Sequence, residues 1–168
     1  MSLPEPAPAA TGRGGVVELK GGCACGAVRY KLTNAPLIVH ACHCRDCQRL
    51  TGSAFVINLW IEKRFVEADR TGLNSFELKG GSGQPHEVFF CRKCGTYLWS
   101  DYHGAPGASW FVRAGTLDDP NAVTPDVHIF TKSKLDWVVL PKDARAFPEF
   151  YSIKDVWPEA SRRRIGRA

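Results

Sequence analysis

Short runs in which apolar and polar residues alternate dominate the chain and predict β-strands. Residues 27–32 show the pattern best, with Val28, Tyr30 and Leu32 on one face and Arg29 and Lys31 on the other. Alternate side chains of a strand point to opposite faces, so one face of this segment is expected in the core. Further strands are expected at residues 16–20, 37–41, 54–61, 73–78, 87–91, 97–100, 110–114 and 127–130.

Helical periodicity is confined to one short segment. Residues 45–50 are expected to form a single helical turn that ends near Gly52. The run KGGSGQP, between the strands expected at 73–78 and 87–91, indicates a Gly/Pro loop. Many short strands separated by turn residues predict an all-β domain with little helix. The large aromatic residues are expected in its core: Trp60, Phe89, Phe90, Trp99, Trp110 and Trp137.

Length and composition indicate one ordinary globular domain. The chain has 168 residues, of which 44% are hydrophobic and 23% charged, and this balance excludes a disordered or fibrous protein. We expect a disordered leader over residues 1–14, a single zinc-binding β domain over 15–150, and a C-terminal extension with a basic tail over 151–168. The longest apolar stretch, residues 55–61, is far shorter than the roughly 20 residues of a bilayer helix, which excludes a membrane-spanning protein.

The charge distribution points to no particular partner. The net charge is +5, and several arginines gather in the tail, including Arg162, Arg163 and Arg164. We interpret them as a solvated terminus and do not favour nucleic-acid binding, which needs basic residues gathered on one folded face. The first residues lack the apolar core of a secretory signal, so a reducing, cytoplasmic location is expected.

Seven cysteines in three groups carry most of the functional information. An odd number cannot pair fully in disulfides, and clustered cysteines in a reducing compartment more often bind metal or take part in catalysis. Two groups are dyads, a C-x-C and a C-x-x-C, and each is followed by glycine. The third is a C-x-C-x-x-C triad. In this order the groups are Cys23 and Cys25, Cys91 and Cys94, and Cys42, Cys44 and Cys47.

The spacings predict two zinc sites of different kinds. Zinc binds thiolates at about 2.3 Å, so ligands from one segment must converge within a tight turn, which a following glycine permits. The two dyads together supply the four ligands of a closed structural zinc site. The triad supplies three thiolates and leaves one position open, although cysteines without metal are the alternative there. Neither common ferredoxin spacing is present, which disfavours an iron–sulfur cluster.

Three residues in or near the triad have more than one interpretation. Alternation places His43 on the face opposite Cys42 and Cys44, so we expect it to support the site without binding metal. Asp46 could accept a proton or cap the short helix, and capping is favoured. His128, in the strand expected at 127–130, either lines a pocket or is a half-buried histidine of the fold.

Three ordered motifs are GCACGAV followed by Tyr30, CHCRDCQ followed by TGSAF, and FCRKCGT followed by Leu98. With residues 125–137 they resemble the glutathione-dependent formaldehyde-activating enzyme family, which also includes centromere protein V, over about residues 16–140. The resemblance implies a zinc-stabilised β-tent of short antiparallel strands and the same division of the cysteines into four and three. It also implies that formaldehyde is joined to glutathione, giving S-hydroxymethylglutathione, which is a carbon–sulfur lyase reaction.

These expectations converge on a zinc-dependent carbon–sulfur lyase that acts on an adduct of glutathione with formaldehyde or a similar small carbonyl compound. The triad is the catalytic candidate and would hold a second, labile zinc, which gives two zinc ions per chain. Glutathione carries carboxylates, so nearby cations are candidate substrate-binding residues, although each is otherwise a solvated surface charge. These weaker candidates are Arg45, Arg49 and Lys93, with His128. The alternative is a non-enzymatic zinc protein that binds a thiol ligand or a macromolecular partner.

Overall fold

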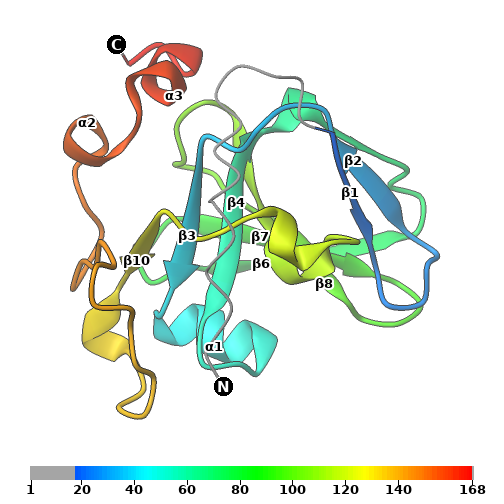
Figure 1. The fold of residues 1–168 in the computed structure, drawn as a ribbon. Helices are drawn as coiled ribbons and strands as arrows, with labels where there is room; N and C mark the ends of the chain where they lie inside the picture. The colour runs from blue at the N-terminus through cyan, green and yellow to red at the C-terminus, as the bar shows by residue number, and fades with distance from the viewer. Residues whose placement is uncertain (1–17, 168) are drawn as a thin grey trace, which may run out of the picture.

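The alternating segments of the chain form two β-sheets (Figure 1). The computed structural model describes residues 18–167, and the leader expected over residues 1–14 lies outside this range. The mostly β fold predicted from the residue pattern is confirmed. The smaller sheet contains, in spatial order, β1 (Leu19–Gly22), β2 (Arg29–Leu32) and β5 (Val66–Ala68). The larger sheet contains β10 (Val127–Ile129), β3 (Ile38–Cys42), β4 (Val56–Glu62), β9 (Ser109–Arg113), β8 (Tyr97–Tyr102), β7 (Pro85–Cys91) and β6 (Leu73–Lys79).

The pairing of the strands places β10 beside the strand that carries the first cysteine of the triad. Strands β3 and β4 pair in antiparallel fashion, with Cys42 opposite Val56. Strand β10 runs parallel to β3, with His128 opposite Ala41 and Ile129 opposite Cys42. A parallel pair needs a long crossover connection, and here the connection contains the strands from β4 to β9. The chain therefore returns to the triad only after the other strands of the larger sheet in sequence order.

Helices in the described residues are short. The helical turn predicted at 45–50 is α1 (Arg45–Thr51), which ends at Gly52 with a φ of 63°, a conformation that glycine adopts at little cost. Two further helices follow the sheets, α2 (Ile153–Val156) and α3 (Glu159–Arg164). None of the described helices has the length and apolar character that a membrane span requires. Single 3₁₀ turns occupy Lys63–Phe65, Ala114–Thr116, Pro120–Ala122 and Thr131–Ser133.

Two apolar clusters share strand β4. Leu59 packs in the first cluster with the fully buried Trp99, whereas Trp60 packs in the second with Phe111 and Trp157. Neighbouring residues of β4 therefore face different clusters, and the strand is buried on both faces. This explains why residues 54–61 read as an almost continuous apolar run and not as an alternating one.

Trp137 corrects the expectation that all the large aromatic residues lie in the core. Its side chain is 72% exposed, whereas Trp60, Trp99 and Trp110 are buried. Phe89 is partly buried, as is Phe90 next to it. Trp137 lies in the irregular segment between β10 and α2, outside the sheets that bury the other aromatic rings. The aromatic content of that segment predicted burial, but no strand places the ring between two layers.

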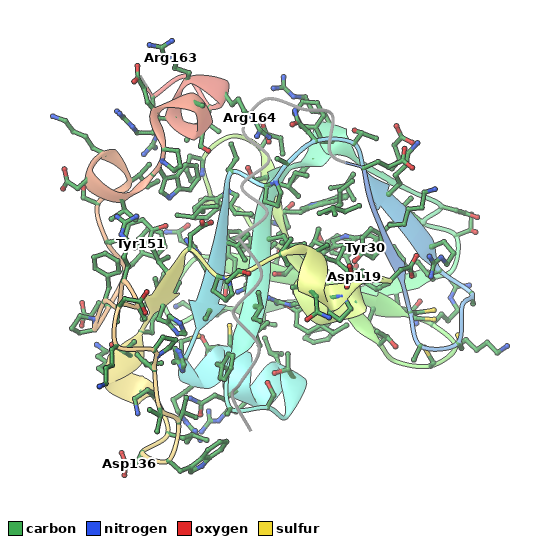
Figure 2. All side chains as sticks on the ribbon, in the orientation of Figure 1. Tyr30, Asp119, Asp136, Tyr151, Arg163 and Arg164 are labelled. Carbon is green, nitrogen blue, oxygen red and sulfur yellow. The ribbon has the colours of Figure 1, made fainter. Side chains whose placement is uncertain are left out.

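Arg164 corrects the expectation of a solvated basic tail. Helices α2 and α3 fold back toward one end of the larger sheet (Figure 1). The Arg164 guanidinium binds both carboxylate oxygens of Glu62, a side chain only 4% exposed, and also donates to the Ala35 carbonyl at 2.9 Å. Arg163 beside it is 68% exposed and pairs with Glu159 on the surface of α3 (Figure 2). Two adjacent arginines thus have different environments.

Candidate functional site

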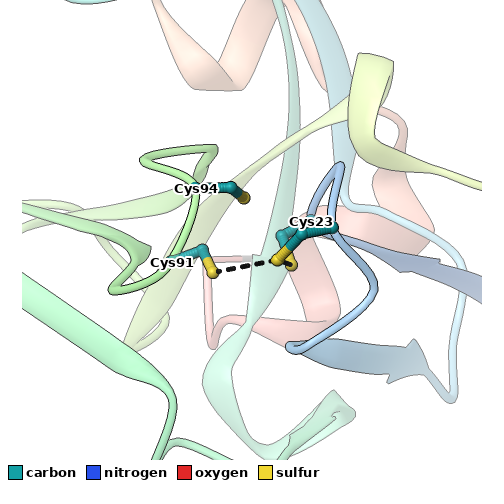
Figure 3. Close-up of side chains that lie close together, drawn as sticks. Cys23, Cys91 and Cys94 are labelled. Carbon is teal, nitrogen blue, oxygen red and sulfur yellow. Dashed lines mark hydrogen bonds between the residues drawn. The ribbon is translucent and has the colours of Figure 1, made fainter.

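The two cysteine dyads occupy two similar turns that face each other (Figure 3). Each turn is followed by a glycine with positive φ, 74° at Gly26 and 73° at Gly95. In each, the glycine amide donates to the carbonyl of the first cysteine of the dyad at 2.9 Å. Glycine adopts this conformation without a steric penalty, which is the reason for its position after the second cysteine. The first turn connects β1 to β2 and the second connects β7 to β8; they carry Cys23, Cys25, Cys91 and Cys94.

The four sulfur atoms form a cluster that fits one zinc ion. All four lie within 4.8 Å of one another, and the Sγ of Cys25 is 3.5 Å from that of Cys23 and 3.8 Å from that of Cys91. Sulfurs bound at 2.3 Å around a tetrahedral zinc are separated by about 3.8 Å. The Val28 amide donates to Cys23 Sγ at 3.2 Å, a hydrogen bond that favours the thiolate. Distances and donors both suit a closed Cys₄ zinc site.

Thr96 connects the two turns. Its hydroxyl accepts a hydrogen bond from the Ala24 amide at 3.1 Å and lies 3.1 Å from Cys94 Sγ. Hydrogen bonds from the Thr96 hydroxyl and amide lower the pKa of Cys94 to about 5. One cysteine of each dyad is buried and the other is exposed, so the cluster lies at the edge of the core. Because β1 and β2 belong to one sheet and β7 and β8 to the other, a metal here would join the two sheets.

The triad lies where β3 passes into α1. Cys42 ends the strand, Cys44 is the N-cap residue of the helix, and Cys47 lies in the first helical turn. Their three sulfur atoms lie within 4.8 Å of one another, so they fit three positions of a tetrahedral zinc site. Cys42 and Cys47 are buried and Cys44 is only partly buried. The cluster is therefore accessible on the side of Cys44.

Negative charge is shared unevenly among the three thiols. Hydrogen bonds from the thiols of Cys42 and Cys47 lower the pKa of Cys44, and the backbone amides of Cys47 and Asp46 lower it further. The pKa of Cys42 is raised because its thiol donates to Cys44 and Cys47. The first thiolate of the triad is thus Cys44, which is also its most accessible member.

His43 and His128 contact each other beside the triad. The Nε2 atom of the fully buried His43 is 3.0 Å from Nδ1 of His128, and the two rings are stacked. Burial lowers the pKa of both residues, that of His43 to about 4, so both rings are neutral at pH 7. The His43 amide donates to the Ile129 carbonyl at 3.0 Å, which fixes this segment against β10. The sulfur cluster of the triad includes no His43 nitrogen.

The cations proposed from the sequence lie in two different places. Arg45 and Arg49 are exposed on α1 and line a cavity of about 350 Å³, whose wall also includes Trp137. Lys93 is exposed in the turn between β7 and β8, beside the other cluster, and does not line this cavity. The structure therefore brings Arg45 and Arg49 together at the triad helix and leaves Lys93 apart from them.

Asp46 has a role that neither of its two interpretations included. Its carboxylate accepts a hydrogen bond from the Gly81 amide at 2.9 Å. Gly81 belongs to the Gly-rich loop between β6 and β7, whereas the N-cap of α1 is Cys44. Asp46 thus connects the triad helix to that loop.

A larger cavity, of about 460 Å³, lies next to both cysteine clusters. The end of α1 and the start of β4 form one wall, and residues at the start of β8 and the end of β9 form the other. Gly95, in the second dyad turn, lines it, and so does Val56, which pairs with Cys42. Thr51 in its wall donates to the Cys47 carbonyl at 2.7 Å. A ligand in this cavity would therefore contact neighbours of Cys42 and Cys47, while the described wall residues include no triad cysteine.

Arg113 is a candidate that the sequence analysis missed. It is 5% exposed and lines the larger cavity. The available signal was an arginine at the end of the strongly apolar run SWFVR, because a buried arginine is rare unless it is paired. Its contacts, Asn58, Tyr97 and Ser100, come from two other strands, so no local spacing could reveal them.

A family model described as "Glutathione-dependent formaldehyde-activating enzyme" matches residues 18–133. The chain belongs to the glutathione-dependent formaldehyde-activating enzyme family. A relative from Halomonas elongata that bears the family's name is 31% identical over 127 residues, which cover 71% of this chain and 79% of that protein. An uncharacterized lyase from Schizosaccharomyces pombe is 27% identical over 120 residues, or 71% of this chain and 82% of that protein. A crystal structure of a Rhodobacter sphaeroides protein has a TM-score of 0.46 and 25% identity, over 59% of this chain and 87% of that one.

The family resemblance predicted from the three motifs is confirmed. The residues matched by the glutathione-dependent formaldehyde-activating enzyme model contain all three motifs and all seven cysteines. They also contain the strands of both sheets, whereas α2 and α3 lie beyond them. The match therefore covers the two sulfur clusters and the larger cavity together.

Proposed function

We propose that this protein is a zinc-dependent carbon–sulfur lyase-type enzyme that acts on an adduct of a small thiol with formaldehyde or a similar aldehyde. Glutathione is the thiol that the family name supplies. Cys42, Cys44 and Cys47 form the proposed active site. The observation that carries this proposal is a three-sulfur cluster, accessible at Cys44, next to a cavity of about 460 Å³. That volume is within the usual range for small-molecule sites.

The two clusters have different proposed roles, because the cysteines of one are far apart along the chain and those of the other are close together. The four dyad cysteines come from two sheets, so their metal would stabilise the fold. The triad comes from residues 42–47 alone, so its metal would connect no distant segments. A closed Cys₄ site has no position for a substrate, whereas a three-thiolate site does. We therefore assign the chemistry to the triad and propose that its zinc is the more labile of two.

The proposed reaction forms one bond and moves one proton. The thiol sulfur donates an electron pair to the aldehyde carbon, the π electrons of the carbonyl pass to oxygen, and the thiol proton ends on that oxygen. A zinc ion held by the triad would supply the positive charge that lowers the pKa of a substrate thiol. The side chains of Leu50, Phe55 and Val56 give the cavity apolar walls, which limit the access of water to the reacting groups.

Weaker substrate contacts are assigned to cations near the triad. Arg45 and Arg49 line the second cavity on the same helix as Cys47, where they could bind a carboxylate. His128 contacts His43 and would act through the position of the triad segment. Lys93 is the least favourably placed of the proposed contacts, since it lies at the closed cluster.

The test measures formaldehyde consumption in the presence of glutathione, above the spontaneous rate, for the parent protein and for Cys44→Ser. The parent should accelerate the reaction and the variant should return to the rate in buffer, because a serine hydroxyl does not replace the thiolate. Zinc content should fall from two ions per chain to one, while the melting temperature changes little. Equal rates for the two proteins would remove the triad from catalysis. A parent rate equal to that of buffer would reject the reaction and favour a thiol-binding zinc protein.

A further inference from the structure

Arg113 is a buried cation without an acidic partner. Its Nη1 donates to Asn58 Oδ1, and its Nη2 donates to the Tyr97 hydroxyl and, at 3.2 Å, to Ser100 Oγ. All three acceptors are neutral. Among residues 18–167, no carboxylate oxygen lies within 4.0 Å of its guanidinium. Charged side chains are almost never buried without a counter-ion, so this environment is incomplete for an arginine.

One hydrogen-bond donor of Arg113 has no acceptor. The Nε atom is buried and makes no hydrogen bond within the described part of the chain. The other side of the guanidinium lies on the Tyr97 ring, with its central carbon 4.0 Å from the ring centroid. A guanidinium that is held by neutral groups, stacked on an aromatic ring and left with a free N–H is preorganised to bind an anion.

The larger cavity provides access to this group. Arg113 and Tyr97 both line it, and among residues 18–167 Arg113 is the one ionised side chain in its wall. The remaining wall is apolar or carries hydroxyl groups. The Tyr97 hydroxyl accepts from Arg113 and lies 3.5 Å from Nε2 of His86. The same cavity extends to Val56, opposite Cys42, so an anion at Arg113 lies beside the triad.

We propose that Arg113 is a specificity-determining residue that binds a carboxylate of the thiol substrate inside the larger cavity. This inference rests on the proposed function, since it concerns the substrate of the same site. The ligand class is a thiol that carries a carboxylate several bonds away from its sulfur, as glutathione does. A structural role for Arg113 as counter-charge to the triad is the competing explanation, because its positive charge acts on the thiol of Cys47.

The test measures binding, so that it does not depend on turnover. Isothermal titration calorimetry compares S-methylglutathione, which has no thiol, with its diethyl ester, in which both carboxylates are masked. The parent should bind the free acid at least about tenfold more tightly, a typical effect of one charge-assisted hydrogen bond. In Arg113→Met the preference should fall below about threefold. Arg163→Met removes the same charge from an exposed position on α3 and should retain the parent's preference.

Each result distinguishes the competing explanations. Equal binding of acid and ester by the parent, or no binding of either, overturns the proposal, as does an unchanged preference in Arg113→Met. A purely structural Arg113 would lower the melting temperature or zinc content of the variant without changing that preference. If Arg113→Met does not fold, Arg113→Lys is the second variant. It keeps the positive charge but lacks the planar guanidinium with its several N–H donors, so its preference for the free acid over the ester should be smaller than the parent's. Carboxylate-dependent binding without formaldehyde turnover would reject the proposed function alone, and turnover without carboxylate preference would reject this inference alone.

Discussion

The ion pair between Arg164 and Glu62 predicts that one of two adjacent arginines stabilises the fold and the other does not. Arg164→Met removes the guanidinium but keeps most of the apolar stem of the side chain. The Glu62 carboxylate, 4% exposed at the end of β4, would then lose its bidentate partner and keep Arg64, an exposed side chain whose Nη2 lies 3.5 Å from Glu62 Oε1. Arg163→Met makes the same chemical change at a side chain that is 68% exposed. The two variants have equal net charge, so they differ only in environment.

The expected magnitudes follow from burial. Removal of one partner of a buried ion pair costs about 3–5 kcal/mol, because the remaining charge is uncompensated. Since the Arg164 side chain is 24% exposed and Arg64 stays 3.5 Å from the Glu62 carboxylate, we expect no more than the lower end of that range, about 3 kcal/mol. The surface pair of Arg163 with Glu159, four residues earlier on the helix, contributes about 0.3–0.5 kcal/mol. In a chain of this size, these values correspond to a loss of about 6–12 °C in melting temperature for Arg164→Met and at most about 2 °C for Arg163→Met.

Thermal unfolding followed by circular dichroism, with zinc in excess and metal content measured on each sample, checks this prediction. A third variant tests the cause. Adding Glu62→Gln to Arg164→Met removes the buried charge while keeping the side-chain shape, so it should recover part of the lost stability. Melting temperatures within about 2 °C of each other for the two arginine variants would refute the reasoning. So would a further loss of stability on adding Glu62→Gln.

Three further variants test other parts of the structure. Replacing both Cys91 and Cys94 with serine removes the whole second dyad and should lower the free energy of unfolding by about 4 kcal/mol, the loop-closure entropy of a link across the 65 residues between the dyads. An unchanged denaturation midpoint would contradict the structural role of that cluster. Burial lowers the pKa of His40 in the folded state to about 3. Below pH 6.5 the unfolded state therefore binds more protons than the folded state, and the free energy of unfolding falls as the pH falls, by about 2 kcal/mol at pH 5. Urea denaturation at pH 7.5 and pH 5 measures the free energy of unfolding of the parent and of His40→Gln. The variant should lose less stability between the two pH values than the parent does. An equal loss in both proteins would count against this prediction. Gly107 has a φ of 79°, and an added Cβ would lie 2.4 Å from Ile165 Cγ2, so Gly107→Ala should cost about 1–3 kcal/mol in a melting experiment. Gly104→Ala, where only an ordinary contact would form, is the control and should change stability by less than about 0.5 kcal/mol.

The features that the sequence predicted correctly depend on local chemistry. Alternation along a strand reflects its two faces, so most strands were located to within a few residues. Strand β5 has three residues, too few to show a period, and it was missed. The meeting of the two dyads was predictable despite their separation, because four cysteines in two glycine-flanked turns match the ligand set that a tetrahedral zinc site requires.

The features that the sequence could not predict depend on contacts between distant segments. Arg113 and Asn58 are 55 residues apart, and nothing near either residue indicates that they meet. Trp137 has the side chain of a typical core residue, but no packed layer of residues 18–167 covers its segment, so it is exposed. The arginines of the tail look alike in sequence, and only the position of Glu62 in the folded sheet distinguishes Arg164 from Arg163.

The pairing of Glu62 with a residue 102 positions later in the chain has a consequence for folding during translation. A ribosome adds about 5–20 residues per second, so roughly 5–20 s pass between the synthesis of the two partners. During that interval the carboxylate at the end of β4 has the exposed Arg64 beside it but lacks the bidentate contact with Arg164. A nascent chain that stops before Arg164 already contains every strand of both sheets and all seven cysteines, yet its Glu62 carboxylate must either stay hydrated or be buried with the exposed Arg64 as its cation. The bidentate contact that covers this end of the sheet is therefore among the last that the growing chain can form.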